Sequence, residues 1–202
     1  MKDNIMLIGL DFETSTGDHR NLSPIQIGIS MPNGKEFESL IALPDEHVWS
    51  MNSQAVHGIE MKELEDAPSI FEVDIRASAF MFDILKEWSA PRMNRVAVGW
   101  NVGSFDRRIV YDYMPNLNNI LSYRTLDLNT VCYFAADILG DSYARIKQKV
   151  KEEAAAEIGE DNWHNALFDA RAGLLNYQML VELVAQGSNE TFENLIKQSV
   201  PK

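Results

Sequence analysis

Hydrophobic residues in the first part of the chain follow the periodicity of β-strands. Residues 5–12 form a nearly continuous apolar run, which is typical of a strand buried on both faces of a sheet. Between residues 25 and 30, three isoleucines alternate with polar or small residues, as in a half-buried strand. A turn sequence at residues 32–34 then leads into residues 36–42, which can return as a hairpin partner. This pattern predicts an antiparallel start of three strands.

The rest of the chain alternates between helical and strand patterns. Residues 70–88 carry Phe71, Ile75, Phe82 and Leu85 near helical spacing, which predicts an amphipathic helix. The remaining expected elements are a strand at 96–100, a helix from residue 105, a strand at 123–128, helices at 129–139, 142–158 and 165–184, and a short terminal helix from residue 190. This order predicts an α/β layered domain. Because no repeat, low-complexity segment or linker interrupts it, we expect a single domain over residues 1–202.

Two acidic residues stand at the end of the first expected strand, in Asp11-Phe12-Glu13-Thr14. Side chains alternate along a strand, so Asp11 and Glu13 point to one side and Phe12 to the other. Two carboxylates at one strand terminus repel each other, and a divalent cation can compensate that repulsion. A solvated strand end is the alternative interpretation, since the chain contains 30 Asp and Glu residues.

A second group of polar residues follows the expected strand at 96–100. Asn101 and Gly103 form a turn, and Asp106 lies in the first turn of the helix that follows. Ligands of open α/β sheets bind at the carboxyl ends of strands, which favours a functional role for Asp106. Complementing the helix dipole is the alternative role for this aspartate.

A third group contains His164 and Asp169. If the histidine lies just before the helix and the aspartate on its second turn, both side chains can face one cavity. A neutral imidazole beside carboxylates is suited to accept a proton from water near neutral pH. A histidine at a helix amino terminus and an exposed acid are the alternative.

In this order, the three groups resemble the three exonuclease motifs of the DEDDh 3′→5′ exonucleases. That superfamily includes the polymerase III epsilon proofreading subunit, ribonuclease T and oligoribonuclease. The resemblance extends from residue 5 to about residue 184 and includes residues 25–28, 56–59 and 124–127. Trp100 departs from the histidine or small polar residue that the family often has before the asparagine. Asn165 stands where the DEDDy branch would have tyrosine, so the histidine branch is favoured.

The resemblance implies a ribonuclease H-like exonuclease fold, with a mixed five-stranded sheet flanked by helices. It implies that two Mg²⁺ or Mn²⁺ ions are held by four carboxylates and that His164 deprotonates the attacking water. The implied metal ligands and catalytic acids are Asp11, Glu13, Asp106 and Asp169. The expected substrate contacts are Phe12, Thr14, His57, Ile59, Asn101 and Phe105, with core packing as the alternative for both phenylalanines.

The implied activity is release of nucleoside monophosphates from single-stranded or frayed 3′ ends of DNA or RNA. Because the chain ends soon after its last expected helix, we expect a free-standing enzyme. A polymerase-associated proofreader is the alternative within the same class. A catalytically silent ribonuclease H-like module that binds a partner protein is the alternative outside it. Small members of the superfamily often form homodimers, which leaves a homodimer open for this chain.

Charge and cysteine content narrow the class of protein further. With 18 Lys and Arg against 30 Asp and Glu, the formal net charge is −12, which argues against a protein that coats nucleic acid by long-range attraction. A local acidic metal site is compatible with that charge. Cys132 is the only cysteine, which excludes an intrachain disulfide and favours a reducing compartment. The first apolar run is too short for a signal sequence or membrane span, so we expect a cytoplasmic protein without a membrane partner.

Overall fold

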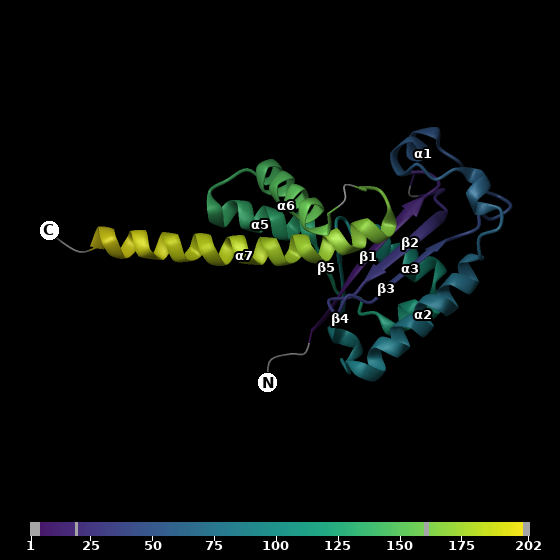
Figure 1. Cartoon of the computed structure of the whole chain (residues 1–202), viewed down its shortest axis with the longest axis horizontal. Helices are drawn as coiled ribbons and strands as arrows, with labels where there is room; N and C mark the ends of the chain where they lie inside the picture. The colour runs from purple at the N-terminus through teal and green to yellow at the C-terminus, as the bar shows by residue number, and fades with distance from the viewer. Residues whose placement is uncertain (1–4, 19, 160–161, 200–202) are drawn as a thin grey trace.

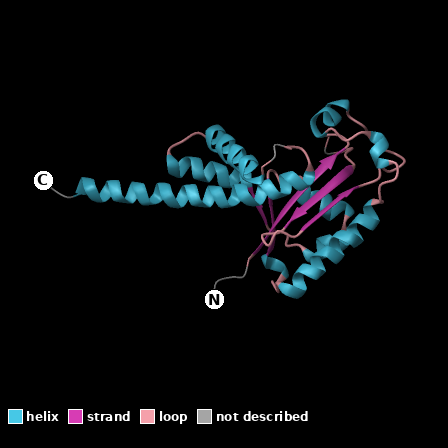
Figure 2. Ribbon diagram, in the orientation of Figure 1, coloured by secondary structure: helices cyan, strands magenta, loops and turns pink. Residues whose placement is uncertain are grey.

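The computed structural model describes residues 5–18, 20–159 and 162–199, and its centre is one mixed sheet. The strands are β1 (Met6–Thr14), β2 (Pro24–Ser30), β3 (Glu36–Leu40), β4 (Arg95–Gly99) and β5 (Thr125–Asp127). Their order across the sheet is β3-β2-β1-β4-β5, and Figure 2 shows them as magenta arrows. β1, β2 and β3 pair antiparallel, whereas β4 and β5 join in parallel. The expected five-stranded mixed sheet and its antiparallel start are confirmed.

Helices pack against both faces of this sheet (Figure 1). One face carries α2 (Ile70–Glu87), α3 (Asp106–Tyr113) and α4 (Pro115–Ile120); the other carries α5 (Leu128–Leu139), α6 (Tyr143–Ile158) and α7 (Ala166–Ser199). Three further short helices lie in the connections: α1 (Met51–His57), η1 (Met61–Leu64) and η2 (Arg92–Asn94). Each face of the sheet has its own hydrophobic core, because successive side chains of β1 point to opposite faces. Ile8, Leu10 and Phe12 pack on the side of α2–α4, and Leu7 packs on the side of α5–α7.

Helix α2 forms where the sequence predicts it, but its buried face differs from the expected one. Phe71, Ile75 and Phe82 are 63%, 47% and 56% exposed. The face toward the sheet is made instead by smaller or more flexible residues that include Ala77 and Met81. Two apolar stripes at helical spacing compete on this helix. The stripe that packs against the sheet and α4 consists mostly of small or flexible side chains, with Phe80 and the expected Leu85 partly buried beside it.

Helix α7 corrects the prediction at the carboxyl-terminal end. The sequence predicts separate helices at 165–184 and from residue 190, whereas α7 runs without a break from Ala166 to Ser199. A Cβ placed on Gly187 would lie 2.1 Å from Cδ2 of Leu139. This glycine therefore lets α5 pack closely instead of ending the helix. The sequence analysis did not predict α4, which begins at Pro115, a position in a helix where proline is favourable.

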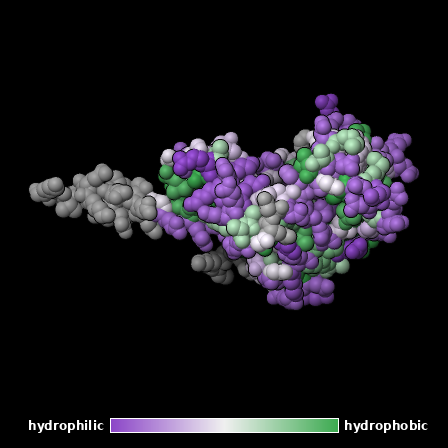
Figure 3. All heavy atoms as spheres, turned by 45° about the horizontal axis from the view of Figure 1, so that its top comes forward, coloured by the Kyte–Doolittle hydropathy of each residue, from purple (hydrophilic) through white to green (hydrophobic). Residues whose placement is uncertain are grey.

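The face seen in Figure 3 is mostly purple, with separate green apolar patches. In the parts of the chain that the structure describes, no helix combines the length and apolar character needed to cross a membrane.

Candidate active site

Two glycines bring the amino-terminal end of α7 directly onto the sheet. A Cβ on Gly9 of β1 would lie 2.1 Å from the carbonyl oxygen of Ala170, and one on Gly28 of β2 would lie 2.1 Å from that of Ala166. No side chain fits at either position without displacing backbone. Gly9, Asp11 and Glu13 share one side of β1, so this close approach places Asp169 of α7 over the two strand acids.

Hydrogen bonds fix the position at which α7 begins. Ala166 donates its backbone N–H to Oε1 of Gln26 on β2, 3.0 Å away. Asn165 caps the helix by accepting the N–H of Phe168 at 3.0 Å, and its amide nitrogen donates to Oε1 of Glu38 on β3 at 3.1 Å. These contacts tie the start of α7 to two strands, and so they orient the residues on either side of it.

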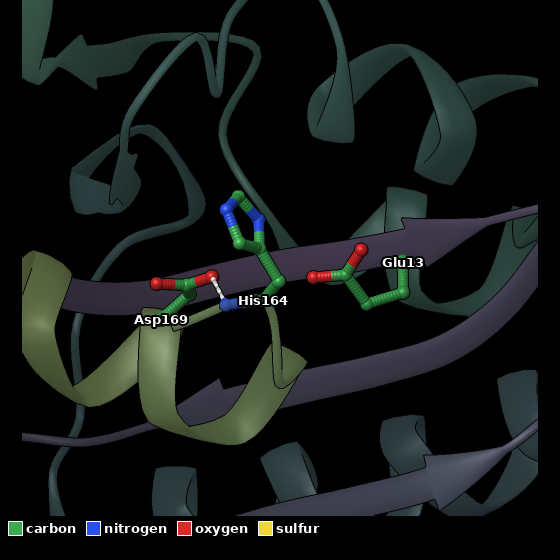
Figure 4. A group of neighbouring side chains, drawn as sticks. All are labelled: Glu13, His164 and Asp169. Carbon is green, nitrogen blue, oxygen red and sulfur yellow. Dashed lines mark hydrogen bonds between the residues drawn. The ribbon is translucent and has the colours of Figure 1, made fainter. Parts of the chain in front are cut away.

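His164 has an uncommon backbone conformation immediately before α7. Its φ angle is +70°, a region that non-glycine residues rarely occupy. In this conformation its backbone N–H donates to Oδ2 of Asp169 at 2.9 Å. Figure 4 shows the carboxylates of Glu13 and Asp169 on either side of His164. Ligand atoms of these three residues all lie within 4.8 Å of one another.

Asp106 reaches the same region from the amino terminus of α3. After β4, the chain turns through Asn101, whose φ is +60°, and enters the helix at Asp106. Oδ1 of Asp106 accepts the backbone N–H of Phe12 at 2.9 Å, and the side chain is only 1% exposed. This bond ties Asp106 to β1 between the two strand acids, so its role extends beyond complementing the dipole of α3.

The predicted catalytic residues all line one cavity of about 520 Å³. Three of the expected substrate contacts, Phe12, Asn101 and Phe105, line it as well. The cavity is also lined by Trp100, the departure from the family pattern, and by three residues that the sequence analysis missed: Ser104, Lys147 and Lys151. A signal for the lysines was present, because they stand four positions apart on an expected helix and therefore share a face.

The acids in this cavity destabilise one another's ionised forms. Burial, with the charges of Asp169 and Asp106, raises the pKa of Glu13 to about 8. Burial raises the pKa of Asp106 to about 8, although the N–H of Phe12 opposes the rise. The pKa of Asp11 is raised well above its ordinary value by burial and then by the charges of Asp106, Asp169 and Glu13. Burial likewise raises the pKa of Asp169.

This electrostatic pattern fits a site for a hard divalent cation. Mg²⁺ and Mn²⁺ prefer carboxylate oxygens, and a cation favours the ionised form of every acid around it. The cluster of Glu13, His164 and Asp169, with Asp11 and Asp106 on the same cavity wall, can hold a metal ion.

The other expected substrate contacts lie beside the cavity. Thr14 and His57 line an adjacent hollow together with Glu13, and Ile59 lines a further one with His57. Nδ1 of His57 accepts the N–H of Ile59 at 3.0 Å, and burial together with the charge of His164 lowers the pKa of His57. Phe12 is 3% exposed and belongs to the core, although it borders the cavity. The substrate roles of these residues stay predictions.

Comparisons with known proteins agree with this architecture. The RNase T family model, described as an exonuclease, matches residues 8–175. Oligoribonuclease from Bordetella pertussis (strain Tohama I) is 40% identical over 60 residues, which are 30% of this chain and 33% of the relative. Oligoribonuclease from Pseudomonas aeruginosa (strain PAO1) is 28% identical over 137 residues, which are 68% of this chain and 65% of the relative. The chain thus spans less than two thirds of the length of either relative.

Solved structures share the fold. The crystal structure of cell-death related nuclease 4 matches with a TM-score of 0.60 at 16% identity, covering 90% of this chain and 66% of that one. The structure of a 3′-exonuclease that recognises the 3′ end of a histone mRNA stem-loop matches with a TM-score of 0.59 at 13% identity, covering 90% and 84%. The predicted exonuclease-type α/β fold is confirmed. From the family match, which spans β1 and the first part of α7, we conclude that the chain belongs to the RNase T exonuclease family.

Proposed function

We propose that this protein is a metal-dependent 3′→5′ exonuclease that releases nucleoside monophosphates from single-stranded or frayed nucleic acid ends. The observation that carries the proposal is the convergence of four acids and one histidine, from three separate segments, on a single cavity. The direction of cleavage is supported by a structural neighbour described as a 3′-exonuclease. A free-standing enzyme with one domain over residues 1–202 is part of the proposal.

In this proposal, Asp11, Glu13, Asp106 and Asp169 hold two Mg²⁺ or Mn²⁺ ions. When bound, such ions supply the charge that activates water and stabilises the scissile phosphate. His164 accepts the proton of the attacking water at its imidazole, because an imidazole nitrogen can act as a general base. Its backbone bond to Asp169 holds it beside the acids. Asn101 and Phe105 border the cavity where the terminal nucleotide would lie.

The test is digestion of 5′-labelled single-stranded DNA, single-stranded RNA and a duplex, each with Mg²⁺, Mn²⁺ or EDTA. The expected product is a ladder that shortens one nucleotide at a time from the 3′ end, with either metal and not with EDTA. Asp106→Asn should abolish the ladder, because it removes a charged ligand while keeping the size of the side chain. Asp112→Asn is the matched control, since Asp112 lies exposed on α3 away from the cavity.

Internal cuts, early release of the 5′ label or full activity in EDTA would each contradict the proposal. Two further predictions need separate measurements. Light scattering reports whether the protein forms a homodimer, and cell fractionation reports whether it lies in the cytoplasm.

A further inference from the structure

Helix α6 presents two lysines to the acidic cavity. Lys147 and Lys151 are one helical turn apart and both line it. Lys151 lies over the ring of Trp163, 3.7 Å from its centroid. Burial raises the pKa of Asp11 and of Asp169, and the charge of Lys151 opposes both rises, so Lys151 lies in the field of the acid cluster. Lys147 stands one turn further toward the amino terminus of α6, beside Trp100.

Lys147 is held in place by neutral groups. Its Nζ lies 4.5 Å from the ring centroid of Trp100, 3.1 Å from the hydroxyl of Tyr143 and 3.3 Å from Oδ1 of Asn129. Tyr143 donates its hydroxyl to the same oxygen of Asn129, and Asn129 donates its amide to Asn101 at 2.7 Å. The ammonium group is therefore positioned before any ligand arrives, which reduces the entropy lost on binding.

Three other basic side chains near the catalytic motifs bind groups of the protein outside the cavity. Arg107 turns inward and donates to the carbonyl of Ser122 at 2.9 Å. Arg108 pairs with Asp112, and Arg171 pairs with Glu36 through two bonds of 2.6 Å. Lys147 differs from Arg108 and Arg171 because its described partners hold it without neutralising its charge, and from Arg107 because it lines the cavity. Its positive charge stays available to an anion at the cavity wall.

We propose that Lys147 binds a backbone phosphate of the single-stranded substrate on the 5′ side of the scissile bond. This inference rests on the proposed function, which puts the scissile phosphate at the acid cluster. The strand then runs along α6 from Lys151 toward Lys147, with its 3′ end at the acids. Trp100, which differs from the residue that the family often has at this position, would then have a function. Its indole face contacts Lys147, the residue that binds the nucleic acid strand.

Binding is measured in a His164→Ala background, which keeps every acidic ligand and slows cleavage. The probes are 5′-fluorescein-labelled single-stranded RNA and DNA of one sequence, and fluorescence anisotropy gives Kd in Mg²⁺ at several NaCl concentrations. Adding Lys147→Gln should weaken binding about tenfold, as expected for loss of a charged hydrogen bond. It should also reduce the slope of log affinity against log salt by about 0.7, the value for one phosphate contact on a single strand.

Two further variants separate this role from a structural one. Lys147→Arg should restore the slope, because the charge is kept. Lys149→Gln removes the same charge from the exposed side of α6, where Lys149 pairs with Glu153 at 3.9 Å, and should leave the slope unchanged. Equal slopes for Lys147→Gln and Lys149→Gln, in a protein whose wild type shortens 3′ ends, would overturn the inference alone. No cleavage by the wild type and no binding by the His164→Ala protein would overturn both proposals.

Discussion

Replacing Glu13 by glutamine should stabilise the metal-free protein while removing a proposed metal ligand. The carboxyl group has an ordinary pKa of 4.5 in an unfolded chain and a pKa of about 8 in the folded protein, because it is buried near Asp169 and Asp106. At pH below 4.5 the carboxyl group is protonated in both the folded and the unfolded state, so it does not lower the stability of the fold. As the pH rises toward 8, the unfolded chain loses its proton first, so the folded protein loses stability.

The size of the effect follows from this difference. Each pH unit between the two pKa values lowers the free energy of unfolding by about 1.4 kcal/mol. At pH 7 the Glu13 carboxyl group therefore lowers the free energy of unfolding by about 3 kcal/mol. Glutamine has nearly the same shape and stays neutral in both states. For a protein of this length, about 3 kcal/mol corresponds to an increase in Tm of roughly 6 to 12 °C.

The assay is thermal unfolding, followed by circular dichroism, of wild type and Glu13→Gln in EDTA at pH 5 and pH 7. The variant should exceed the wild type in stability by less than about 1 kcal/mol at pH 5 and by about 3 kcal/mol at pH 7. Saturating Mg²⁺ should narrow the difference at pH 7, because a cation restores the benefit of the ionised carboxylate. Glu65→Gln, at an exposed position, is the control and should have little effect. A Glu13→Gln difference that is the same at both pH values, or of opposite sign, would refute the reasoning.

Three further substitutions test the histidine, one packing contact and the hydrogen bonds at the start of α4. His164→Ala should lower turnover by about 10² to 10⁴-fold on a labelled oligonucleotide and keep Mn²⁺ binding in calorimetry; wild-type turnover would exclude a proton-transfer role. Gly28→Ala should cost about 1 to 3 kcal/mol in urea unfolding, because its Cβ would meet the backbone of α7, whereas Gly17→Ala, with open space around it, should be neutral. Asp74→Ala should cost about 3 kcal/mol in the same assay, since its carboxylate accepts two backbone N–H groups at the start of α4; a change below about 1 kcal/mol would contradict this.

The sequence predicted the sheet and the common side of the two strand acids, because both depend on local patterns. Alternation along one strand is enough to put Asp11 and Glu13 on the same side, and the structure has them on one cavity wall. The lysines of α6 were missed because their importance depends on where α6 packs, which spacing alone does not specify. The exposed stripe of α2 was misjudged for a similar reason. Which apolar stripe is buried depends on the shape of the neighbouring elements.

The contact of α7 with Gly9 and Gly28 has a consequence for folding. Asp11 and Glu13 lie near one end of the described chain, and Asp169 lies more than 150 positions later. An ion shared by β1 and α7 would therefore act as a reversible cross-link that closes a long loop, and loops of this length carry a large closure entropy. During synthesis, the acids of β1 leave the ribosome before α7 has been made, so the complete set of acids forms only after α7 has packed against the sheet. Metal affinity should thus appear only when the last third of the domain has folded, which makes the bound ion a sensor of completed tertiary structure.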